Sequence, residues 1–483
     1  MKSINSVVKN FINEERNFRI LFVLCFLFHC VCIIEPVCSA LTNLLMIWSI
    51  LFTGKRFIKI RNLWKIRYNI FLILFLLCGI FTTFLNYSNN FFQNIKLIYL
   101  TCICFILLYG MHTSYTKEER TYEFYSLFHF LTIIINIFAI IGILILVCFV
   151  HIELSNYTLG LYGNRYTGIY THPNIAAFIS IVGIISNHIL YDKKKRNSKN
   201  LFFYRIVFLL MIHIHILTIW LSDSNASMVY MIVYLLVYTV FKNIDKFSQN
   251  KSRIFLHIFL LTLLVFASFS LRTTVQNCTV TLIENIHTTE SENTIEASSS
   301  AKPKLEDSVQ IGRTKQKDIS SGRIDSIKKA LLLFEIKPLL GMGKANIIPY
   351  GNIYLTEGFL FFDLHNGYLT ILLSCGIVGF YIFTLFLIQL FKRMLYILNH
   401  RNLIINTDKS IIEILISALL GYCIYAFFER TILFDLTFMV IFFWAMLGYF
   451  MSFSLEYEEK NEHIFIFKNE LINSLNKVKN FLL

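Results

Sequence analysis

The 483-residue sequence is strongly apolar: 56% of its residues are hydrophobic and only 15% are charged. This balance excludes an ordinary soluble domain, in which about a quarter of the residues are charged. With 48 phenylalanines, five prolines and nineteen glycines, the composition favours long apolar helices over a turn-rich β architecture. The net charge of +14 does not indicate nucleic-acid binding, because the basic residues lie in short clusters between apolar runs.

Twelve apolar runs are suited to crossing a bilayer as helices. The first two form a hairpin broken at Glu35-Pro36, since proline marks a turn. We expect spans at 18–34, 37–53, 68–86, 95–111, 124–150, 175–191, 201–221, 226–242, 254–271, 367–391, 411–428 and 436–454. The sequence therefore predicts an all-α polytopic membrane protein.

Positive charge is distributed unevenly between the loops that join these spans. Alternate loops are rich in lysine and arginine, whereas the opposite short loops contain only Arg165 and Arg430. By the positive-inside rule, the basic loops and both termini are cytoplasmic and residues 272–366 form one large outer loop. The expected organisation is nine helices in 1–271, this loop, three helices in 367–454 and a cytoplasmic tail over 455–483.

The large loop has two parts of different composition. Residues 288–317 are rich in Ser, Thr, Glu and Lys and nearly free of aromatic residues, so we expect them to be poorly ordered. From Ser321 onward, hydrophobic residues recur at helical spacing up to Lys337-Pro338, which predicts helical structure within 321–366. Only Cys278 among the eleven cysteines falls in this loop, so the loop forms no internal disulfide.

The two arginines of the outer short loops run against the charge bias of the other loops. A guanidinium fork binds phosphate oxygens bidentately, so the functional interpretation is an anion site on the outer face. The alternative is a snorkelling or ion-paired arginine, for example Arg430 with Glu429 or Asp435. Asn174 stands where the N-cap of the next span is expected, and its loop would aim Arg165 at a ligand near the membrane surface.

The large loop and its exit supply two further candidates. Arg323 opens the helical half of the loop, and Asp325 is its simplest ion-pair partner. His365 lies beside Asn366 at the mouth of a predicted helix, and an unperturbed histidine titrates near neutral pH, which suits proton abstraction from a hydroxyl. A structural role is the alternative for a lone histidine at an interface.

Two glycines follow on the same predicted helix. Gly376 and Gly379 are three residues apart on an apolar helix, a spacing that favours close helix packing over chemistry.

The ordered set of these motifs resembles the O-antigen polymerase and O-antigen ligase family, of the Wzy and WaaL types, over roughly residues 160–380. The motifs are 165–174, the turn 222–225, Ser321-Gly322-Arg323, Pro338 with Gly341 and Gly343, and His365-Asn366 with Gly376 and Gly379. The resemblance implies that the catalytic residues are His365, Arg323 and Arg165, and that the substrate-binding residues are Asn366, Asn174, Asn225 and Arg430.

One position departs from the pattern of the family. Many relatives carry an arginine after the serine turn, where this chain has Asn225. We expect Arg165 or Arg430 to supply the missing positive charge.

The resemblance implies a surface polysaccharide repeat-unit polymerase in the cytoplasmic membrane of a bacterium. The donor would be a polyprenyl-diphosphate-linked glycan and the acceptor a second lipid-linked sugar on the outer face. His365 would deprotonate the acceptor hydroxyl while arginines stabilise the departing diphosphate, which inverts the anomeric carbon without a metal or other cofactor. Membrane lipid, a chain-length regulator and a flippase are the further expected partners, and nucleic acid is not.

Three alternatives stay open at this point. A ligase that moves a finished glycan from the same carrier to another acceptor would use the same His365 and glycine motifs, and only the Ile, Asn, Lys and Phe bias favours a polymerase. A transporter or flippase for the lipid-linked sugar is disfavoured because the sequence lacks two related halves. A membrane scaffold would leave the arginine and histidine motifs unexplained.

Overall fold

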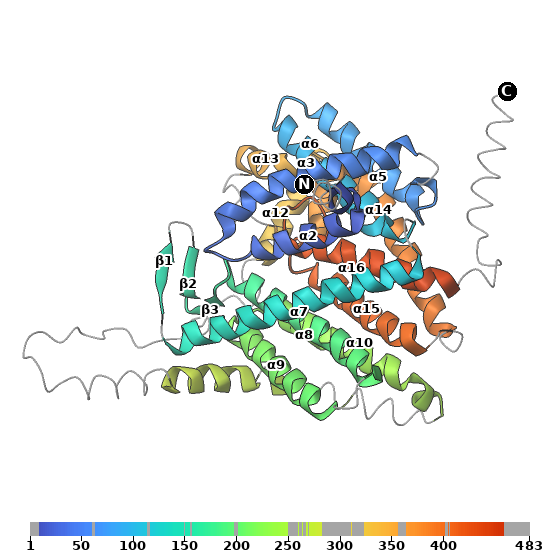
Figure 1. The fold of residues 1–483 in the computed structure, drawn as a ribbon. Helices are drawn as coiled ribbons and strands as arrows, with labels where there is room; N and C mark the ends of the chain where they lie inside the picture. Colours follow the sequence, from blue (N-terminus) through green and yellow to red (C-terminus); the bar gives the residue numbers. More distant parts are fainter. Residues whose placement is uncertain are drawn as a thin grey trace, which may run out of the picture.

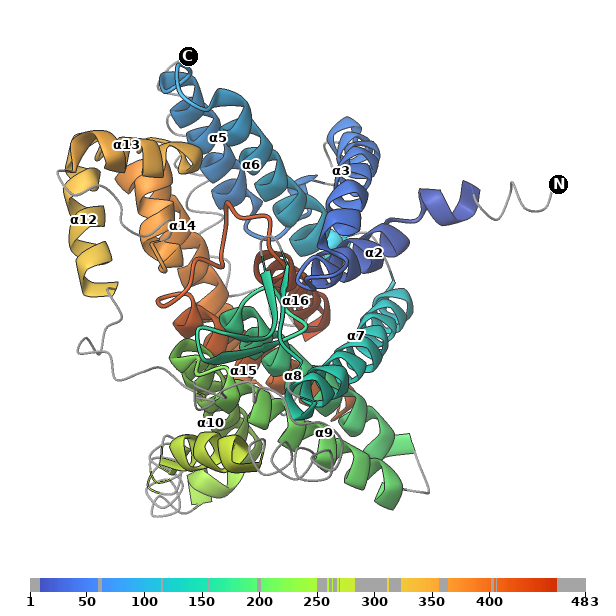
Figure 2. The ribbon, with the colours of Figure 1, turned by 90° about the vertical axis from the view of Figure 1, so that its left-hand side faces the viewer.

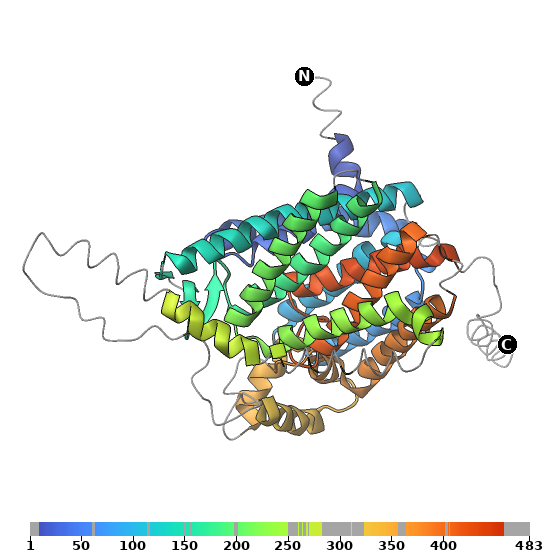
Figure 3. The ribbon, with the colours of Figure 1, turned by 90° about the horizontal axis from the view of Figure 1, so that it is seen from below.

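In the computed structural model the long helices run roughly along one direction (Figures 1 and 3). The structure describes residues 9–59, 63–113, 116–148, 150–154, 157–197, 201–249, 270–282, 323–355, 364–400 and 406–457, with isolated positions between 259 and 311 and at 404. Almost all of the predicted poorly ordered segment 288–317, most of the tail 455–483 and most of the span predicted at 254–271 lie outside these residues.

The helices of the first half of the chain are α2 (Glu15–Phe28), α3 (Glu35–Ile58), α5 (Asn69–Leu85), α6 (Phe91–Ile103) and α7 (Lys117–Val147). α6 continues through a π-helical turn, Cys104–Leu108, and a 3-10 turn, Tyr109–Thr113. The later helices are α8 (Pro173–Asn197), α9 (Leu201–Leu221), α10 (Asn225–Gln249), α12 (Arg323–Ile336), α13 (Ile347–Tyr354), α14 (Gly367–Asn399), α15 (Asn406–Tyr425) and α16 (Phe438–Ser454). Short 3-10 turns lie at Lys344–Asn346 and Leu455–Tyr457.

Seven helices of the described residues are long and apolar enough to cross a membrane: α3, the α6 unit, α7, α8, α9, α10 and α14. All seven were predicted as spans, and the chain is an all-α polytopic membrane protein. α5 and α16 are also apolar but contain 17 residues each. α15, predicted as the span 411–428, is not one of the seven, and its sequence carries Asp408, Lys409 and Glu413.

The first predicted span differs from the observed helix. α2 ends at Phe28 after 14 residues, a rise of about 21 Å, which is shorter than a hydrocarbon core of about 30 Å. Its first turns carry charge into the bundle: Arg19 is buried and its Nη2 lies 2.6 Å from Glu123 Oε2 on α7. α2 is therefore anchored by an ion pair as well as by apolar packing.

A three-stranded antiparallel sheet lies at one end of the bundle, in a segment expected to be a loop (Figure 1). Its strands are β1 (Ile152–Leu154), β2 (Tyr157–Tyr162) and β3 (Arg165–Gly168). β2 and β3 are joined by Gly163 and Asn164, with φ of +52° and +59°, the positive pair that a tight hairpin turn requires. This turn pairs Tyr162 with Arg165, so the hairpin fixes the position of the arginine.

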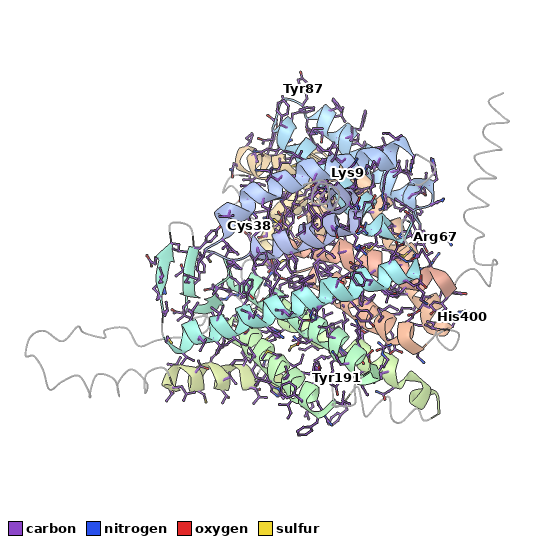
Figure 4. The ribbon with its side chains drawn as sticks, in the orientation of Figure 1. Lys9, Cys38, Arg67, Tyr87, Tyr191 and His400 are labelled. Carbon is purple, nitrogen blue, oxygen red and sulfur yellow. The ribbon has the colours of Figure 1, made fainter. Side chains whose placement is uncertain are left out.

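Basic residues lie at one end of the bundle and the sheet lies at the other. Figure 4 shows Arg67 and His400 at the end away from the sheet. Basic residues also occupy the last turns of α3 and α8, including Lys55, Arg56 and Arg196. Figure 2, viewed from the sheet end, shows the three strands in front of the helices, and the sheet packs against α7 and α8. The basic loops and the sheet are thus separated by the length of the helices.

α14 is broken inside the bundle at Gly376, which has φ +63° and ψ −169°, a backbone conformation essentially restricted to glycine. The turn that follows α12 fills the break. Ile377 N–H donates to Pro338 O at 2.8 Å, and Met342 N–H donates to Leu373 O at 3.0 Å. A Cβ on Gly376 would lie 2.3 Å from Leu339 O. The glycine therefore serves close backbone packing, as its spacing indicated.

Candidate active site

Helix ends and loops from five parts of the chain meet beside the sheet. They are the start of α8, the turn between α9 and α10, the start of α12, the residues just before α14 and the residues just after α15. Contacts between their side chains join these parts in space. The site is therefore built from helix ends, where the terminal backbone N–H and C=O groups have no partner within the helix.

His365 immediately precedes Asn366, the N-cap of α14. Its backbone φ is +45°, which is uncommon for a residue other than glycine. Its Nδ1 lies 3.3 Å from Glu429 Oε2. A carboxylate only accepts hydrogen bonds, so this contact places the imidazole proton on Nδ1 and leaves Nε2 able to accept a proton.

Glu429 joins the predicted site residues to one another. Its side chain is 11% exposed, and its Oε1 accepts a hydrogen bond of 2.8 Å from Asn174 Nδ2. Arg323 Nη2 lies 3.7 Å from the same oxygen. One buried carboxylate therefore contacts α8, α12 and the segment before α14.

Arg323 is the first residue of α12 and lies over the ring of Phe428, with 6.0 Å between the guanidinium carbon and the ring centroid. The expected local pair with Asp325 does not form in the described contacts, where Asp325 pairs with Lys329 at 3.2 Å. Within the part of the chain that the structure describes, the buried Nε of Arg323 has no hydrogen-bond partner. The guanidinium is thus held by a carboxylate and a ring rather than by its own helix.

Arg165 was expected to hold a phosphate, but its guanidinium is engaged with protein groups. Its Nε donates to Ser222 O at 2.9 Å and its Nη2 donates to Asn174 Oδ1 at 2.7 Å. Asp223 O accepts a longer bond of 3.4 Å from Nη2. Arg165 therefore connects the sheet to the turn between α9 and α10, and it reaches Glu429 through Asn174.

The two asparagines beside the site differ from the sequence expectation. α8 begins at Pro173, so Asn174 lies inside the helix and is not its N-cap; its backbone N–H instead donates to His172 Nδ1 at 3.1 Å. The side chain of Asn174 is free to bridge Arg165 and Glu429. Asn366, expected to bind substrate, uses its side-chain oxygen to accept bonds of 3.0 Å from the N–H groups of Tyr368 and Leu369.

Arg430 and Asn225 also have protein partners. Arg430 Nε lies 3.1 Å from Asp435 Oδ2, the ion pair named as its structural alternative. Asn225 Oδ1 accepts a bond of 2.7 Å from Arg272 Nη1. Neither Arg165 nor Arg430, the two residues expected to compensate for Asn225, makes this contact; Arg272 does.

A cavity of about 310 Å³ opens beside these groups. Arg323, His365, Asn366 and Asn225 form its polar part, and α10, α12 and the segment after α15 supply its apolar part. Its lining residues are Asn225, Ala226, Val229, Arg323, Ile324, Ile327, Leu364, His365, Asn366, Phe427 and Phe428. Arg165, Asn174 and Arg430 lie outside this lining. The cavity is therefore amphipathic, lined by a cation and an imidazole together with aliphatic and aromatic side chains.

Residues 206–384 match a family model described as O-antigen ligase. The chain carries an O-antigen ligase domain. No curated protein matches the chain. This match supports glycan handling of the O-antigen ligase or polymerase type in a membrane.

The O-antigen ligase domain contains part of the site but not all of it. Arg323, His365, Asn225 and Arg272 lie within the matched residues, as do Gly376 and Gly379. The sheet, the start of α8 and the segment after α15 lie outside them. These three segments, which lie before and after the matched residues in the sequence, therefore complete the site.

Glu429 and Arg272 were not assigned a role from the sequence. Glu429 was considered only as a partner of the adjacent Arg430, whereas the structure turns it toward His365 and Arg323. The available signal was a carboxylate at the outer end of a predicted span, the same end as the arginine and histidine motifs. Arg272 stood at the predicted boundary between a span and the large loop, where it had no motif around it.

Proposed function

We propose that this protein is a surface polysaccharide repeat-unit polymerase that transfers glycan from a polyprenyl-diphosphate carrier to a lipid-linked acceptor sugar. The observation that carries the proposal is that Arg323 and His365 line one cavity and share the buried carboxylate of Glu429. Such a cavity combines a base for the acceptor, a cation for the leaving group and an apolar wall for the lipid. The match of residues 206–384 to the O-antigen ligase family model supports this substrate class.

His365 is the proposed general base. With its Nδ1 proton directed at Glu429, its Nε2 accepts the proton of the attacking hydroxyl. The nearby carboxylate favours the imidazolium that then forms. Glu429 is thus a positioning residue that selects the tautomer and the ring orientation of the base, while Asn366 positions His365 by capping α14.

The leaving group is a diphosphate, which gains negative charge as the bond to the anomeric carbon breaks. A new carbon–oxygen bond forms to the acceptor hydroxyl on the opposite side, the hydroxyl proton passes to His365, and the diphosphate departs with the bonding electron pair. A single displacement of this kind inverts the anomeric carbon. Arg323 is the proposed fixed cation that stabilises the departing charge.

Arg165 takes a different role from the one the sequence predicted. Because Arg165 bonds Asn174 and Asn174 bonds Glu429, we propose that both act through Glu429 as positioning residues. Arg430, paired with Asp435, stays a candidate for binding the glycan outside the cavity.

A ligase that delivers a finished glycan to another acceptor is the second candidate, because the donor chemistry and the base are shared. The composition bias of the sequence favours the polymerase. A flippase would place its polar groups near the middle of the membrane, whereas the groups described above gather at one end of the helices. Further proposed partners are a chain-length regulator and a flippase that supplies the lipid-linked repeats.

We also propose the bacterial cytoplasmic membrane as the location, with both termini in the cytoplasm, twelve spans and the site on the outer face. Residues 1–271 and 367–454 would form the spans, with 272–366 as the large outer loop and 455–483 as the tail. Support comes from the basic residues at the end of the bundle opposite the sheet.

Purified protein supplied with lipid-linked repeat units tests the proposed reaction. The expected result is a ladder of longer glycans that remain on the carrier lipid. His365→Ala should lower the rate by about 10²-fold or more, the usual contribution of a general base. His213→Ala is the matched control, since His213 is an exposed histidine of α9 whose Nδ1 contacts Leu209 O, and its rate should not change.

Disruption of the gene separates the candidate functions in cells. Single repeats on the cell surface, without long chains, support the polymerase. Long chains that accumulate on the carrier favour the ligase instead. An unchanged surface glycan, or full activity of His365→Ala in the purified system, would contradict the proposal.

A further inference from the structure

We propose that Arg272 binds the donor diphosphate at the edge of the cavity and is the cation that replaces an arginine at position 225. The inference rests on the proposed function, because it assigns a ligand group to the same cavity. Arg272 lies in the described helical segment 270–282, at the start of the large loop. The cation thus comes from a different element than the turn that begins α10.

The contacts of Arg272 place it one side chain away from the cavity. Its Nη1 lies 2.7 Å from Asn225 Oδ1 and 2.7 Å from Asp223 Oδ1. Asn225 itself lines the cavity with Arg323 and His365. The side chain of Arg272 is 19% exposed, so it is partly accessible to a ligand that enters there.

The short side chain of Asn225 explains how Arg272, which is distant in sequence, reaches the edge of the cavity. Asparagine ends after its amide group, whereas an arginine at the same position would fill the space with its own guanidinium. The amide oxygen of Asn225 also accepts a hydrogen bond from the guanidinium. Residue 225 is therefore not itself the cation; it contacts the cationic side chain of Arg272.

Asp223 contacts two arginines of the site. Its carboxylate pairs with Arg272, and its backbone oxygen accepts the long bond from Arg165. Asp223 holds this arrangement in a backbone conformation with φ +50°, which is uncommon outside glycine. A turn that presents both its carboxylate and its carbonyl to arginines keeps two guanidinium groups close together.

The ligand that fits this arrangement is a diphosphate. Arg323 of α12 lines the cavity, and Arg272 contacts Asn225 of α10, which also lines it. A diphosphate has two phosphate groups to contact the two guanidinium groups. Guanidinium forks bind phosphate oxygens in bidentate geometry. Arg272 therefore increases affinity for the diphosphate over a monophosphate, and it stabilises the charge that develops as the diphosphate leaves.

Binding of polyprenyl diphosphate and polyprenyl monophosphate to the full-length protein in lipid nanodiscs tests the inference. Arg272→Ala should weaken diphosphate binding by about tenfold or more, the typical cost of losing a charged hydrogen-bond donor. Monophosphate binding should change less. Lys328→Ala, which removes an exposed positive charge from α12, is the matched control and should bind both lipids like the wild type.

A double variant separates ligand binding from a structural ion pair. Arg272→Ala combined with Asn225→Arg returns a guanidinium to the cavity edge without restoring the original pair. Recovery of diphosphate binding and of the preference over monophosphate supports the inference. Unchanged diphosphate affinity in Arg272→Ala would overturn it, as would a lower melting temperature together with an equal loss of both lipids and no recovery in the double variant.

The same proteins distinguish this inference from the proposed function. Failure of the wild type to transfer glycan, with Arg272-dependent binding of the diphosphate intact, would refute the polymerase and leave the diphosphate site standing. Active wild type, inactive His365→Ala and an Arg272→Ala variant with wild-type donor KM would refute only the role of Arg272.

Discussion

At the scale of single residues, the site depends on one carboxylate that contacts several partners. Glu429 approaches His365, Arg323 and Asn174 from the end of α15. Its negative charge is stabilised by the arginine and the amide, and it directs the Nδ1 proton of the histidine. The backbone of His365 has a positive φ, which costs about 1–3 kcal/mol when the residue is not glycine. Neighbouring contacts must hold the histidine in that conformation.

Glu429→Gln tests this positioning role. The amide keeps the size of the side chain but removes the charge, and its NH₂ group can face His365 and favour the wrong tautomer. We expect kcat to fall on the order of 10²-fold with little change in the donor KM. In the wrong tautomer, Nε2 of His365 already carries a proton and cannot accept one from the acceptor hydroxyl. Steady-state kinetics with lipid-linked repeats provide the measurement.

An exposed carboxylate at the same end of the protein serves as the control for Glu429. Glu153 of β1 is 85% exposed, so Glu153→Gln should keep the wild-type kcat. A kcat for Glu429→Gln equal to that of this control would contradict the positioning role.

Sequence reasoning proposed Arg323 and His365 as site residues because each stands in a recognisable motif, and the two line one cavity. It did not identify Glu429, since a glutamate followed by an arginine reads as a local pair, whereas the structure pairs Arg430 with Asp435. Which helix ends become neighbours decides such pairings, and this depends on the packing of helices that are distant in sequence. Arg272 is the same case, 47 residues from the Asn225 that it contacts.

At the scale of elements, the break in α14 links the two parts of the site. The turn after α12 bonds to the backbone of α14 on both sides of Gly376. Gly341 in this turn has φ +72°, and a Cβ there would lie 2.5 Å from Gly376 N. Gly341 and Gly376 therefore allow the turn and α14 to approach closely, because a Cβ on either residue would clash with the backbone of the other segment.

Gly376→Ala should destabilise the protein by about 2–4 kcal/mol, because alanine disfavours this backbone conformation and its methyl group would clash with Leu339 O. Thermal unfolding of purified protein in detergent measures the effect. Gly54→Ala in α3 is the control, since a Cβ there meets nothing within 4 Å and alanine favours a helix by about 0.5–1 kcal/mol. Equal melting temperatures for the two variants would show that the break is not needed for stability.

Most helices could be predicted, because a long apolar run in a membrane protein has few alternatives to a helix. α9, for example, begins and ends at the predicted residues. The sheet was missed because its strands contain three to six residues, too few for a clear alternating pattern. The Gly163-Asn164 pair was the available signal, as it suits a two-residue hairpin turn.

At the scale of the whole molecule, the basic residues and the site occupy opposite ends of the bundle. The last turns of α3 and α8 carry lysine and arginine, and the sheet lies at the other end (Figure 1). By the positive-inside rule, we propose that the basic end faces the cytoplasm and that the site lies on the outer side.

Cysteine labelling in right-side-out membrane vesicles tests this orientation. Cys278 is exposed on the segment 270–282, and Cys148 is exposed at the end of α7 just before β1, so a membrane-impermeant maleimide should modify both without permeabilisation, and the double variant Cys148→Ser/Cys278→Ser should lose that signal. Lys59→Cys, introduced at an exposed position after α3 in this double-variant background, should react only after permeabilisation. The reverse pattern would place the site in the cytoplasm.

The backbone bonds at the break of α14 also bear on how the cavity could change its width. α12 begins with Arg323, and the turn after it is bonded to α14, whose cap follows His365. The cation and the base thus belong to one mechanically continuous piece, whereas Asn225, Phe427 and Glu429 belong to the surrounding helices. A displacement of that piece would admit or release a bulky sugar chain but would also part the guanidinium and the imidazole from Glu429, so the base would be aligned only after the piece had returned to its place against that carboxylate.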